Sequence, residues 1–279
     1  MRIAELYSSL QGEGLLTGTP SVFVRASGCN LRCWFCDTPY TSWQPEGEDW
    51  AVEEIVQEVL QLAARPELPA VAWSGDQGTT LGDQAARGAV ARSGDRTATS
   101  GNPATTATAL GLGPLRHVVI TGGEPMLFAE LIPLTERLRT SGMHLTIETA
   151  GTLLLPVACD LMSISPKLAT SSPAAADAGR WAERHERTRH QPHVIRGLLA
   201  EYPYQLKFVV DSPADCALVE AWLTEFPEAN RSRVLLMPQG TDAAALAATA
   251  AWLEPYCAAH GYVYCPRKHI EWYGARRRT

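Results

Sequence analysis

Three closely spaced cysteines are the residues of this sequence best suited to chemistry. Cys29, Cys33 and Cys36 occur in the segment Cys-Asn-Leu-Arg-Cys-Trp-Phe-Cys, directly after a short apolar run. Cysteine thiolates hold iron–sulfur clusters, and three of them on so short a loop can bind three irons of a cubane cluster. The fourth iron then has no local protein ligand, and an open metal position is a reactive one. We therefore expect a [4Fe–4S] centre with one open corner.

A zinc site completed by a remote Cys or His is the alternative interpretation of these cysteines. Zinc loops usually use paired Cys-x₂-Cys hairpins, which this spacing does not match. The other four cysteines (Cys159, Cys216, Cys257 and Cys265) are scattered among apolar residues, and we expect them to be small core residues.

A second motif, Thr121-Gly-Gly-Glu-Pro125, follows another apolar run. Gly122 and Gly123 permit close approach of the backbone, so that free amide and carbonyl groups can meet a ligand. A tight turn between a strand and a helix would need the same residues. The pair alone therefore leaves both interpretations open.

The elements that must position these motifs alternate between strands and helices. Apolar, β-rich runs predict strands at 21–25, 117–121, 144–148, 161–164, 205–210, 233–237 and 262–265. Apolar residues at helical spacing predict helices from Val52, over 131–138, around 218–223 and over 242–260. Such alternation predicts an α/β fold with parallel βαβ units. We expect a partial βα barrel; a complete barrel or an open sheet are the alternatives.

We expect residues 1–279 to form a single domain with two loop insertions. Segment 74–113 is rich in Gly, Ala, Thr and Ser and contains no aromatic residue, so it buries too little apolar surface to offset its ordering entropy. It predicts a flexible insertion. Segment 169–191 is polar, with clustered Arg, His and Glu, and predicts a second insertion.

Composition argues against several classes of partner. The formal net charge is −6 and the pI is about 5.7, whereas nucleic-acid binding usually needs a basic surface. The run Arg276–Arg278 is the local exception, and we interpret it as a solvated tail. No apolar run approaches the ~18 residues that span a bilayer, and the N-terminal residues lack a signal-peptide pattern. We expect a cytoplasmic protein that binds neither nucleic acid nor membrane.

Both motifs together resemble those of the radical S-adenosylmethionine superfamily, namely Cys-x₃-Cys-x₂-Cys with Phe35 before the last cysteine, and Gly-Gly-Glu at 122–124. The resemblance implies that the amino and carboxylate groups of S-adenosylmethionine chelate the fourth iron. Reductive cleavage then releases a 5′-deoxyadenosyl radical that removes a hydrogen atom from the substrate. An external, flavodoxin-like electron donor is implied. The cofactor contacts implied here are Trp34, Phe35, Cys36, Gly122, Gly123 and Glu124.

Further segments are similar to those of the 7-carboxy-7-deazaguanine synthase family. In the N-terminal part these segments are 10–14, 23–25 and 28–38. Further similar segments are 121–125, 148–151, 165–167, 236–240 and 266–274. That family converts 6-carboxy-5,6,7,8-tetrahydropterin to 7-carboxy-7-deazaguanine, with loss of ammonia, in queuosine and deazapurine biosynthesis. Its members are typically homodimers, and segments 74–113 and 169–191 have no counterpart in the shorter ones.

The family resemblance assigns substrate roles to Leu10, Gln11, Gly12, Glu13, Arg25, Thr121 and His269. The planar fork of Arg25 suits a pterin carboxylate, although a surface salt bridge would use it equally well. Gln11 and Glu13 carry groups that can read an aminopyrimidinone edge. His269 is either a substrate contact or an ordinary exposed histidine.

The same resemblance assigns cofactor and metal roles further along the chain. Ser165, Pro166 and Lys167 match a cofactor-binding segment, and Gln239 is expected to contact the adenosine. Glu148 is expected either to contact the ribose or to make a buried structural hydrogen bond. Thr38 matches a ligand of Mg²⁺, a hard cation that accepts oxygen donors.

Two competing functions remain at this stage. A glycyl-radical-enzyme activase shares the three-cysteine loop, but the Gln11–Gly14 segment and Arg25 suit a small polar heterocycle rather than a protein loop. A non-catalytic iron–sulfur or zinc module would have four fixed protein ligands and would not cleave the cofactor.

Overall fold

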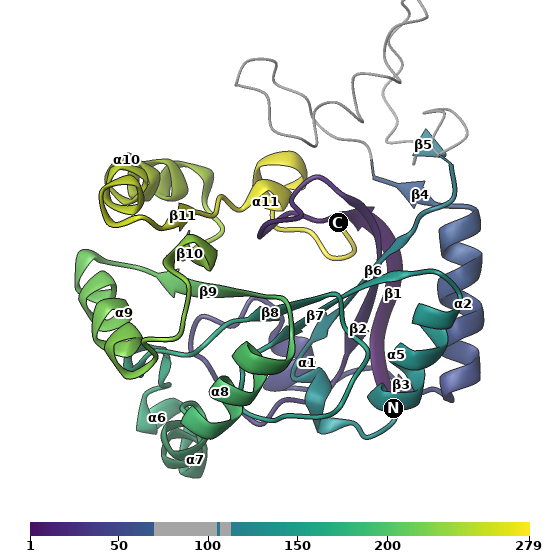
Figure 1. Cartoon of the computed structure of the whole chain (residues 1–279), viewed down its shortest axis with the longest axis horizontal. Helices are drawn as coiled ribbons and strands as arrows, with labels where there is room; N and C mark the ends of the chain where they lie inside the picture. Colours follow the sequence, from purple (N-terminus) through teal and green to yellow (C-terminus); the bar gives the residue numbers. More distant parts are fainter. Residues whose placement is uncertain (70–104, 107–112) are drawn as a thin grey trace, which may run out of the picture.

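One curved, nine-stranded sheet organises the chain (Figure 1). The computed structural model describes residues 1–69, 105–106 and 113–279. Its strand order is β11-β10-β9-β8-β7-β6-β2-β1-β3, and the strands from β2 to β11 in that order are parallel. Among the strands described, β11 and β3 are the two edges, so the sheet is open. This confirms the α/β class and the incomplete barrel.

All seven predicted strands are present. They are β2 (Pro20–Ala26), β6 (His117–Gly122), β7 (His144–Thr149), β8 (Leu161–Ile164), β9 (Tyr204–Val210), β10 (Val234–Pro238) and β11 (Val263–Tyr264). The prediction missed β1 (Arg2–Leu10), which pairs antiparallel with β2. The polar residues of β1, among them Glu5, Ser8 and Ser9, are buried and interrupt the apolar pattern. Also missed were β3 (Glu48–Asp49) and a two-residue ladder between β4 (Glu67–Leu68) and β5 (Thr105–Thr106).

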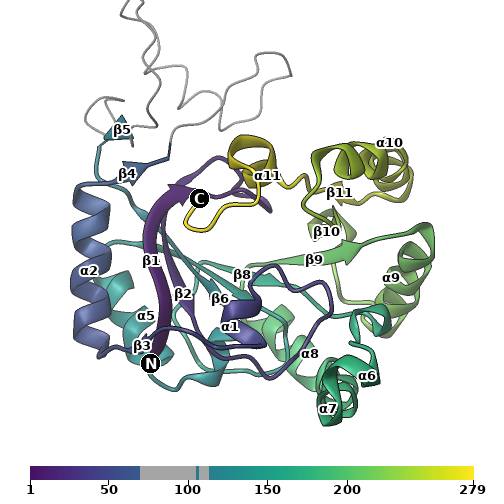
Figure 2. The same ribbon diagram turned by 180° about the vertical axis from the view of Figure 1, so that it is seen from behind.

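Helices cover the outer, convex face of this sheet (Figures 1 and 2). The four predicted helices are α2 (Val52–Ala64), α5 (Leu131–Thr140), α9 (Pro213–Glu225) and α10 (Ala243–His260). The prediction did not include α8 (Pro192–Glu201) or the short α1 (Pro39–Ser42) and α11 (Lys268–Tyr273). A 3₁₀ turn, η1 (Pro125–Leu127), follows β6, and another, η3 (Arg231–Arg233), precedes β10.

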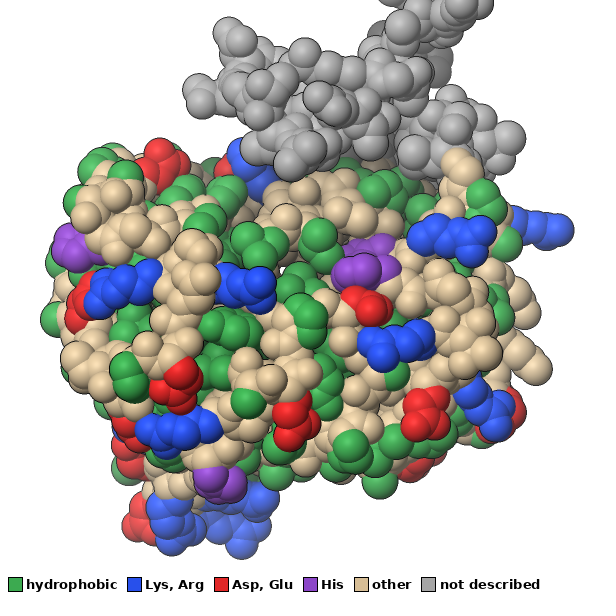
Figure 3. Space-filling view, viewed as in Figure 1, with side chains coloured by type: hydrophobic (Ala, Val, Ile, Leu, Met, Phe, Trp, Pro, Cys, Tyr) green, Lys and Arg blue, Asp and Glu red, His purple; other side chains and the backbone are tan. Residues whose placement is uncertain are grey.

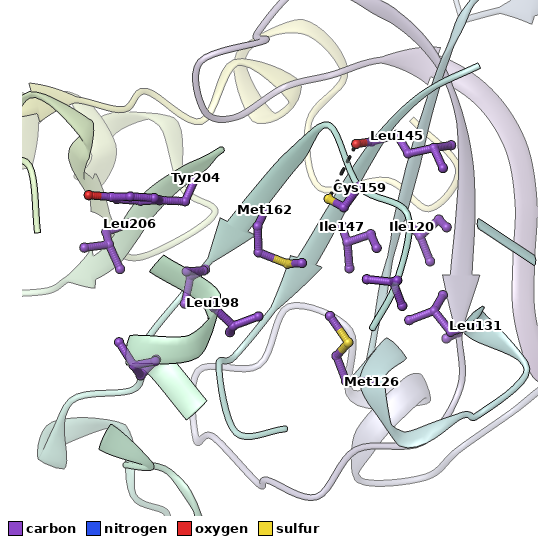
Figure 4. Close-up of a cluster of buried hydrophobic side chains, with 14 of the residues drawn as sticks. Ile120, Met126, Leu131, Leu145, Ile147, Cys159, Met162, Leu198, Tyr204 and Leu206 are labelled. Carbon is purple, nitrogen blue, oxygen red and sulfur yellow. Dashed lines mark hydrogen bonds between the residues drawn. The ribbon is translucent and has the colours of Figure 1, made fainter. Parts of the chain in front are cut away.

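The main core lies between the sheet and the helices (Figure 4). Ile120, Ile147, Met162 and Leu206, from four neighbouring strands, are fully buried there. Because side chains alternate across a strand, the residues between them face the inner, concave side. There Val119 packs with Tyr7 and Phe23, whose rings stack with centroids 5.2 Å apart. The inner face is therefore free to carry other residues of these strands into a cavity.

The two expected insertions differ in what the structure describes. Apart from Thr105–Thr106 and the final glycine, segment 74–113 lies outside the described residues. Segment 169–191 is helical rather than an irregular loop, with η2 (Ala169–Ser171), α6 (Ala175–Ala178) and α7 (Arg180–Thr188). Its anchor is the buried His185, which accepts a hydrogen bond from Arg32 N (3.0 Å) and lies 3.0 Å from Ser171 Oγ. Apolar periodicity could not reveal this helix because its buried residue is polar.

Within the described ranges, every helix is too short or too polar to cross a bilayer. On the face seen in Figure 3, acidic and basic side chains are interspersed. That face carries no continuous basic surface of the kind that binds nucleic acid.

Candidate active site

A cavity of about 350 Å³ opens on the inner side of the sheet, at the C-terminal ends of the parallel strands. In α/β folds this edge is the usual location of ligand sites. The cavity is lined by three groups of residues that lie far apart in the sequence: the loop from Leu10 to Glu13, the cysteine loop, and the residues that end β6, β7 and β8. His269 and the last residues of the chain complete its wall.

All three cysteines of the motif line this cavity, together with Phe35. They follow β2 and pack with Leu31 and Ala150. Burial raises the pKa of Cys29 to about 12 and that of Cys33 to about 11. Without a metal these two thiols would therefore stay protonated at neutral pH, and iron would have to stabilise the thiolates.

The arrangement fits a cubane cluster with one open corner. Of the seven cysteines, all described, only Cys29, Cys33 and Cys36 line the cavity, and the other four are buried elsewhere. In the part of the chain that the structure describes, no three His, Cys, Asp or Glu side chains surround a single-ion site. A cubane binds each thiolate through a different iron, so it needs three sulfurs around one cavity rather than around one atom.

Gly122 and Gly123 bring the turn after β6 against the cysteine loop. The strands β2 and β6 are neighbours, with Ala26 opposite Gly122. A Cβ on Gly122 (φ +120°) would lie 2.1 Å from Ala26 O, and one on Gly123 would lie 2.0 Å from Gly28 O. Only glycine fits at this distance. Gly123 N donates to Ala26 O (3.0 Å), which ties the turn to the end of β2.

A hydrogen-bonded group of four predicted site residues lies beside this turn. Glu148 accepts from Thr121 Oγ1 (2.7 Å) and from Gln11 Nε2 (3.3 Å), and Gln11 Oε1 accepts from Glu13 N (3.2 Å). Glu148 thus makes the structural hydrogen bonds that were one of its two expected roles. The group joins the N-terminal loop to the ends of β6 and β7.

Glu13 is surrounded by cations. Its two carboxylate oxygens face Lys207 Nζ (2.5 Å), Arg267 Nε (3.4 Å) and His269 Nδ1 (3.7 Å). Burial alone would raise the pKa of Glu13, but Lys207, Arg267 and His269 together hold it well below its ordinary value. Burial lowers the pKa of His269, although Glu13 opposes this effect. Glu13 is therefore ionised at neutral pH and ready to accept hydrogen bonds.

Arg25 lines the cavity, and hydrogen bonds to Glu5 and Tyr7 fix its guanidinium. Its Nε donates to Glu5 Oε2 (2.9 Å) and its Nη2 to Tyr7 Oη (2.6 Å). The guanidinium has more N–H donors than these two contacts use. Tyr40 Oη and Arg277 Nε also donate to Glu5, at 3.0 and 2.9 Å. The interaction of Arg25 is thus a buried pair rather than the alternative surface salt bridge.

Four predicted cofactor contacts do not line the cavity. The indole of Trp34 is half exposed and donates to Thr170 O (2.8 Å). Glu124 is fully buried and accepts from Thr149 Oγ1 and Ala150 N, so it supports the turn from behind. Pro166 is buried without reaching the cavity, and Gln239 N donates to Val210 O. By contrast, Ser165 and Lys167 line it, as does Thr38.

The arginines at the end of the sequence are exposed, as a solvated tail would be, but they also contact the site. Residues 275–279 line the cavity, and Arg277 pairs with the buried Glu5 and lies over the ring of Tyr40, 3.7 Å from its centroid. The sequence did not indicate this contact, because Glu5 is distant in sequence and lies on the strand that the apolar pattern missed.

Lys207, Arg267 and Tyr7 are among the cavity residues that sequence reasoning did not assign, and the buried Glu5 behind them was also not assigned. A signal for Lys207 was present, since a lysine in the middle of the run Tyr-Gln-Leu-Lys-Phe-Val-Val is unusual unless it is paired. Arg267 had no comparable signal, because its partners Glu13 and Asp37 follow from the tertiary fold alone.

Comparisons with known proteins agree with this geometry. The family model described as the Radical SAM superfamily matches residues 23–99, and the open sheet with a three-thiol cavity defines a radical S-adenosylmethionine enzyme. The crystal structure of QueE from Escherichia coli has a similar fold, with a TM-score of 0.57 at 22% identity, covering 96% of this chain and 94% of that one.

Curated relatives narrow the class to one family. The 7-carboxy-7-deazaguanine synthase of Rhodopirellula baltica is 39% identical over 99% of this chain and 88% of its own length. That of Halobacterium salinarum is 38% identical, over 96% and 88%. The chain belongs to the 7-carboxy-7-deazaguanine synthase family.

We predict that Cys33→Ala abolishes the cluster, because each of the three thiolates holds one iron. Iron and sulfide content after anaerobic reconstitution, with the visible absorption spectrum, measures this. Cys216→Ala, a buried cysteine outside the cavity, is the matched control and should reconstitute fully. A complete cluster in the Cys33 variant would contradict the assignment.

We also predict that Gly123→Ala separates the turn from the cysteine loop, because the new Cβ has no room beside Gly28 O. The variant should lose binding of S-adenosylmethionine, measured by calorimetry on the reconstituted protein. Gly113→Ala, where a Cβ would meet nothing within 4 Å, is the control. Unchanged affinity in the Gly123 variant would show that the contact is dispensable.

Proposed function

We propose that this chain converts 6-carboxy-5,6,7,8-tetrahydropterin to 7-carboxy-7-deazaguanine by radical ring contraction with loss of ammonia. The single observation that carries the proposal is the cavity itself. It places three cluster-type thiols and the polar residues Gln11, Glu13, Arg25 and Thr121 around one cavity. These groups match a small heterocycle with a carboxylate better than a protein loop, so they favour a synthase over a glycyl-radical-enzyme activase.

The residues divide between cofactor and substrate. When bound, the cluster and S-adenosylmethionine supply a 5′-deoxyadenosyl radical for hydrogen-atom abstraction. Cys29, Cys33 and Cys36 would hold the cluster. Gly122 and Gly123 would present backbone groups to the cofactor, and Lys167, whose Nζ donates to Ser165 Oγ (2.7 Å), is placed to pair with the cofactor carboxylate.

On the substrate side, the cavity separates an anion-binding end from a hydrogen-bonding end. Arg25 would bind the pterin carboxylate through donors that Glu5 and Tyr7 leave free. Gln11 and the ionised Glu13 would accept from the N–H groups of the aminopyrimidinone edge. This would fix the ring so that the carbon that loses hydrogen meets the radical.

Thr38 is the residue that would hold magnesium. Thr38 lines the cavity and its hydroxyl lies 3.1 Å from Thr41 Oγ1, so an oxygen donor suited to Mg²⁺ is present at the substrate site. Thr38 would hold the ion, which would neutralise oxygens of the substrate. The external electron donor and the homodimer rest on the family resemblance.

The decisive experiment is anaerobic reconstitution followed by incubation with S-adenosylmethionine, a reductant and carboxytetrahydropterin. Mass spectrometry should detect a deazaguanine carboxylate whose mass is that of the substrate less one ammonia. The conversion is redox-neutral, so the hydrogen that the radical removes must be returned, and the product should exceed the 5′-deoxyadenosine that is released. Cofactor cleavage without any deazaguanine would exclude this substrate while keeping the radical mechanism.

We predict that Arg25→Ala raises KM for the pterin roughly 10- to 100-fold, since a charged hydrogen bond contributes about 1.5–3 kcal/mol. Uncoupled cleavage of the cofactor should persist, because Arg25 is not part of the cluster site. Arg139→Ala, an exposed arginine paired with Asp160, is the control. Loss of iron in the Arg25 variant would assign Arg25 a structural role instead.

A further prediction concerns magnesium. Thr38→Ala should make turnover require a higher Mg²⁺ concentration, because one oxygen ligand is lost. Titration of activity with MgCl₂ after treatment with a chelator measures the shift. Identical titration curves for the variant and the wild type would remove Thr38 from the site.

A further inference from the structure

Lys207 is buried in the wall of the active-site cavity although it lies in an apolar strand. On β9 the side chains of Leu206, Phe208 and Val210 are fully buried and join the main core. The alternate residues face the other side of the sheet, and of these Lys207 and Val209 line the cavity. The sequence contains three lysines, and Lys207 is the one that is almost fully buried. An ammonium group at such a position must be paired.

The partners of Lys207 are two residues of the proposed substrate site. Its Nζ lies 2.5 Å from Glu13 Oε2 and 3.9 Å from Glu148 Oε1. Burial would lower the pKa of Lys207, but Glu13 and Glu148 raise it above its ordinary value. Lys207 is therefore a fixed cation between the N-terminal loop and the end of β7.

We propose that Lys207 is a positioning residue that orients Glu13 as an ionised acceptor for the N–H donor edge of the heterocyclic substrate. This inference rests on the proposed function. It assigns part of the substrate recognition to a residue outside the cysteine and Gly-Gly-Glu motifs. Each carboxylate oxygen has a second lone pair, so Glu13 can accept from the substrate while Lys207 holds it.

The backbone of the N-terminal loop is fixed separately from the Glu13 side chain. A Cβ on Gly12 would lie 2.5 Å from His269 Cβ, and one on Gly14 (φ +81°) would lie 2.4 Å from Gln205 Nε2. Leu15 N donates to Gln205 Oε1 (2.8 Å). Packing therefore positions the loop, whereas the direction of the Glu13 carboxylate is left to its charged neighbours.

Lys207 is the strongest of those neighbours. The charged and titratable groups near Glu13 come from several elements: Lys207 of β9, Arg267 just before α11, His269 of α11, the Cys265 thiol after β11 and, across Lys207, Glu148 of β7. Arg267 is shared with Asp37, whose Oδ2 lies 2.6 Å from Arg267 Nη2. His269 is charged only if protonated, and its pKa is lowered. Without Lys207, the permanent cation left beside the ionised Glu13 would be Arg267, whose Nε lies 3.4 Å away and whose guanidinium is shared with Asp37.

The test compares Lys207→Met with Lys268→Met. Lys268 is the matched control because it is a partly exposed lysine whose Nζ pairs with Glu271 (2.7 Å) and does not line the cavity. We expect Lys207→Met to raise KM for carboxytetrahydropterin roughly 10- to 100-fold. Iron content and the rate of uncoupled cofactor cleavage should match the wild type.

A pH profile and a double variant separate positioning from a merely structural role. Loss of Lys207 raises the pKa of Glu13, so KM in the Lys207 variant should climb as pH falls, at pH values where the wild type is still flat. Glu13→Gln should raise KM in the wild type but add little in the Lys207→Met background, because the two residues act as a unit.

Each outcome decides a different question. An unchanged KM, or additive effects in the double variant, overturns the role of Lys207. A parallel fall in iron content, cofactor cleavage and thermal stability also overturns it, because Lys207 would then support the fold. For the case that the Met variant does not fold, Lys207→Arg keeps the charge and must retain the pH profile. A wild type that makes no deazaguanine would contradict the proposed function instead.

Discussion

The backbone contact between the cysteine loop and the Gly122–Gly123 turn is the constraint on which the site depends. It exists because β2 and β6 are parallel neighbours whose C-terminal ends meet at one edge, with Arg25 opposite Thr121. Side chains on the two glycines would push these ends apart. The loop that carries the thiols, the turn that would meet the cofactor and the arginine that would meet the substrate are thus placed by a single strand pairing.

A second requirement is that the carboxylates of Glu5, behind the cavity, and Glu13, in its wall, are paired with cations. Glu5 binds Arg25 and Arg277, while Glu13 binds Lys207 and Arg267. Burying unpaired ions is costly, so these pairs fix where each guanidinium and carboxylate lies before any ligand arrives. Substrate binding then requires little rearrangement of the protein, and such preorganisation favours both affinity and rate.

Local patterns predicted most of this architecture, and two of their failures, β1 and α7, have the same cause. The seven parallel strands and the long helices follow from apolar periodicity, and the three cysteines and two glycines from motif spacing. The pattern missed β1 because Glu5, Ser8 and Ser9 are buried polar residues, and it missed α7 because its anchor is His185. Periodicity detects burial only where burial is apolar. Lys207, Arg267 and the arginine-rich end of the chain depend on partners far away in sequence, which no local pattern contains.

The antiparallel strand β1 explains why those distant partners converge. If β1 were parallel to β2, a crossover connection, usually a helix, would have to join the two strands. The end of β1 would then lie at the cluster edge. As an antiparallel neighbour of β2, β1 instead runs away from that edge along its whole length and ends in the Leu10–Glu13 loop, which closes back over the cavity toward β9. Glu5 lies midway along it, opposite Arg25, and there it also meets Arg277, 272 positions later in the chain. One strand therefore holds Arg25 through Glu5 and leads into the loop that carries Gln11 and Glu13 to the cavity. Of the polar residues that hid β1 from the apolar pattern, Glu5 is the one that holds Arg25 in place.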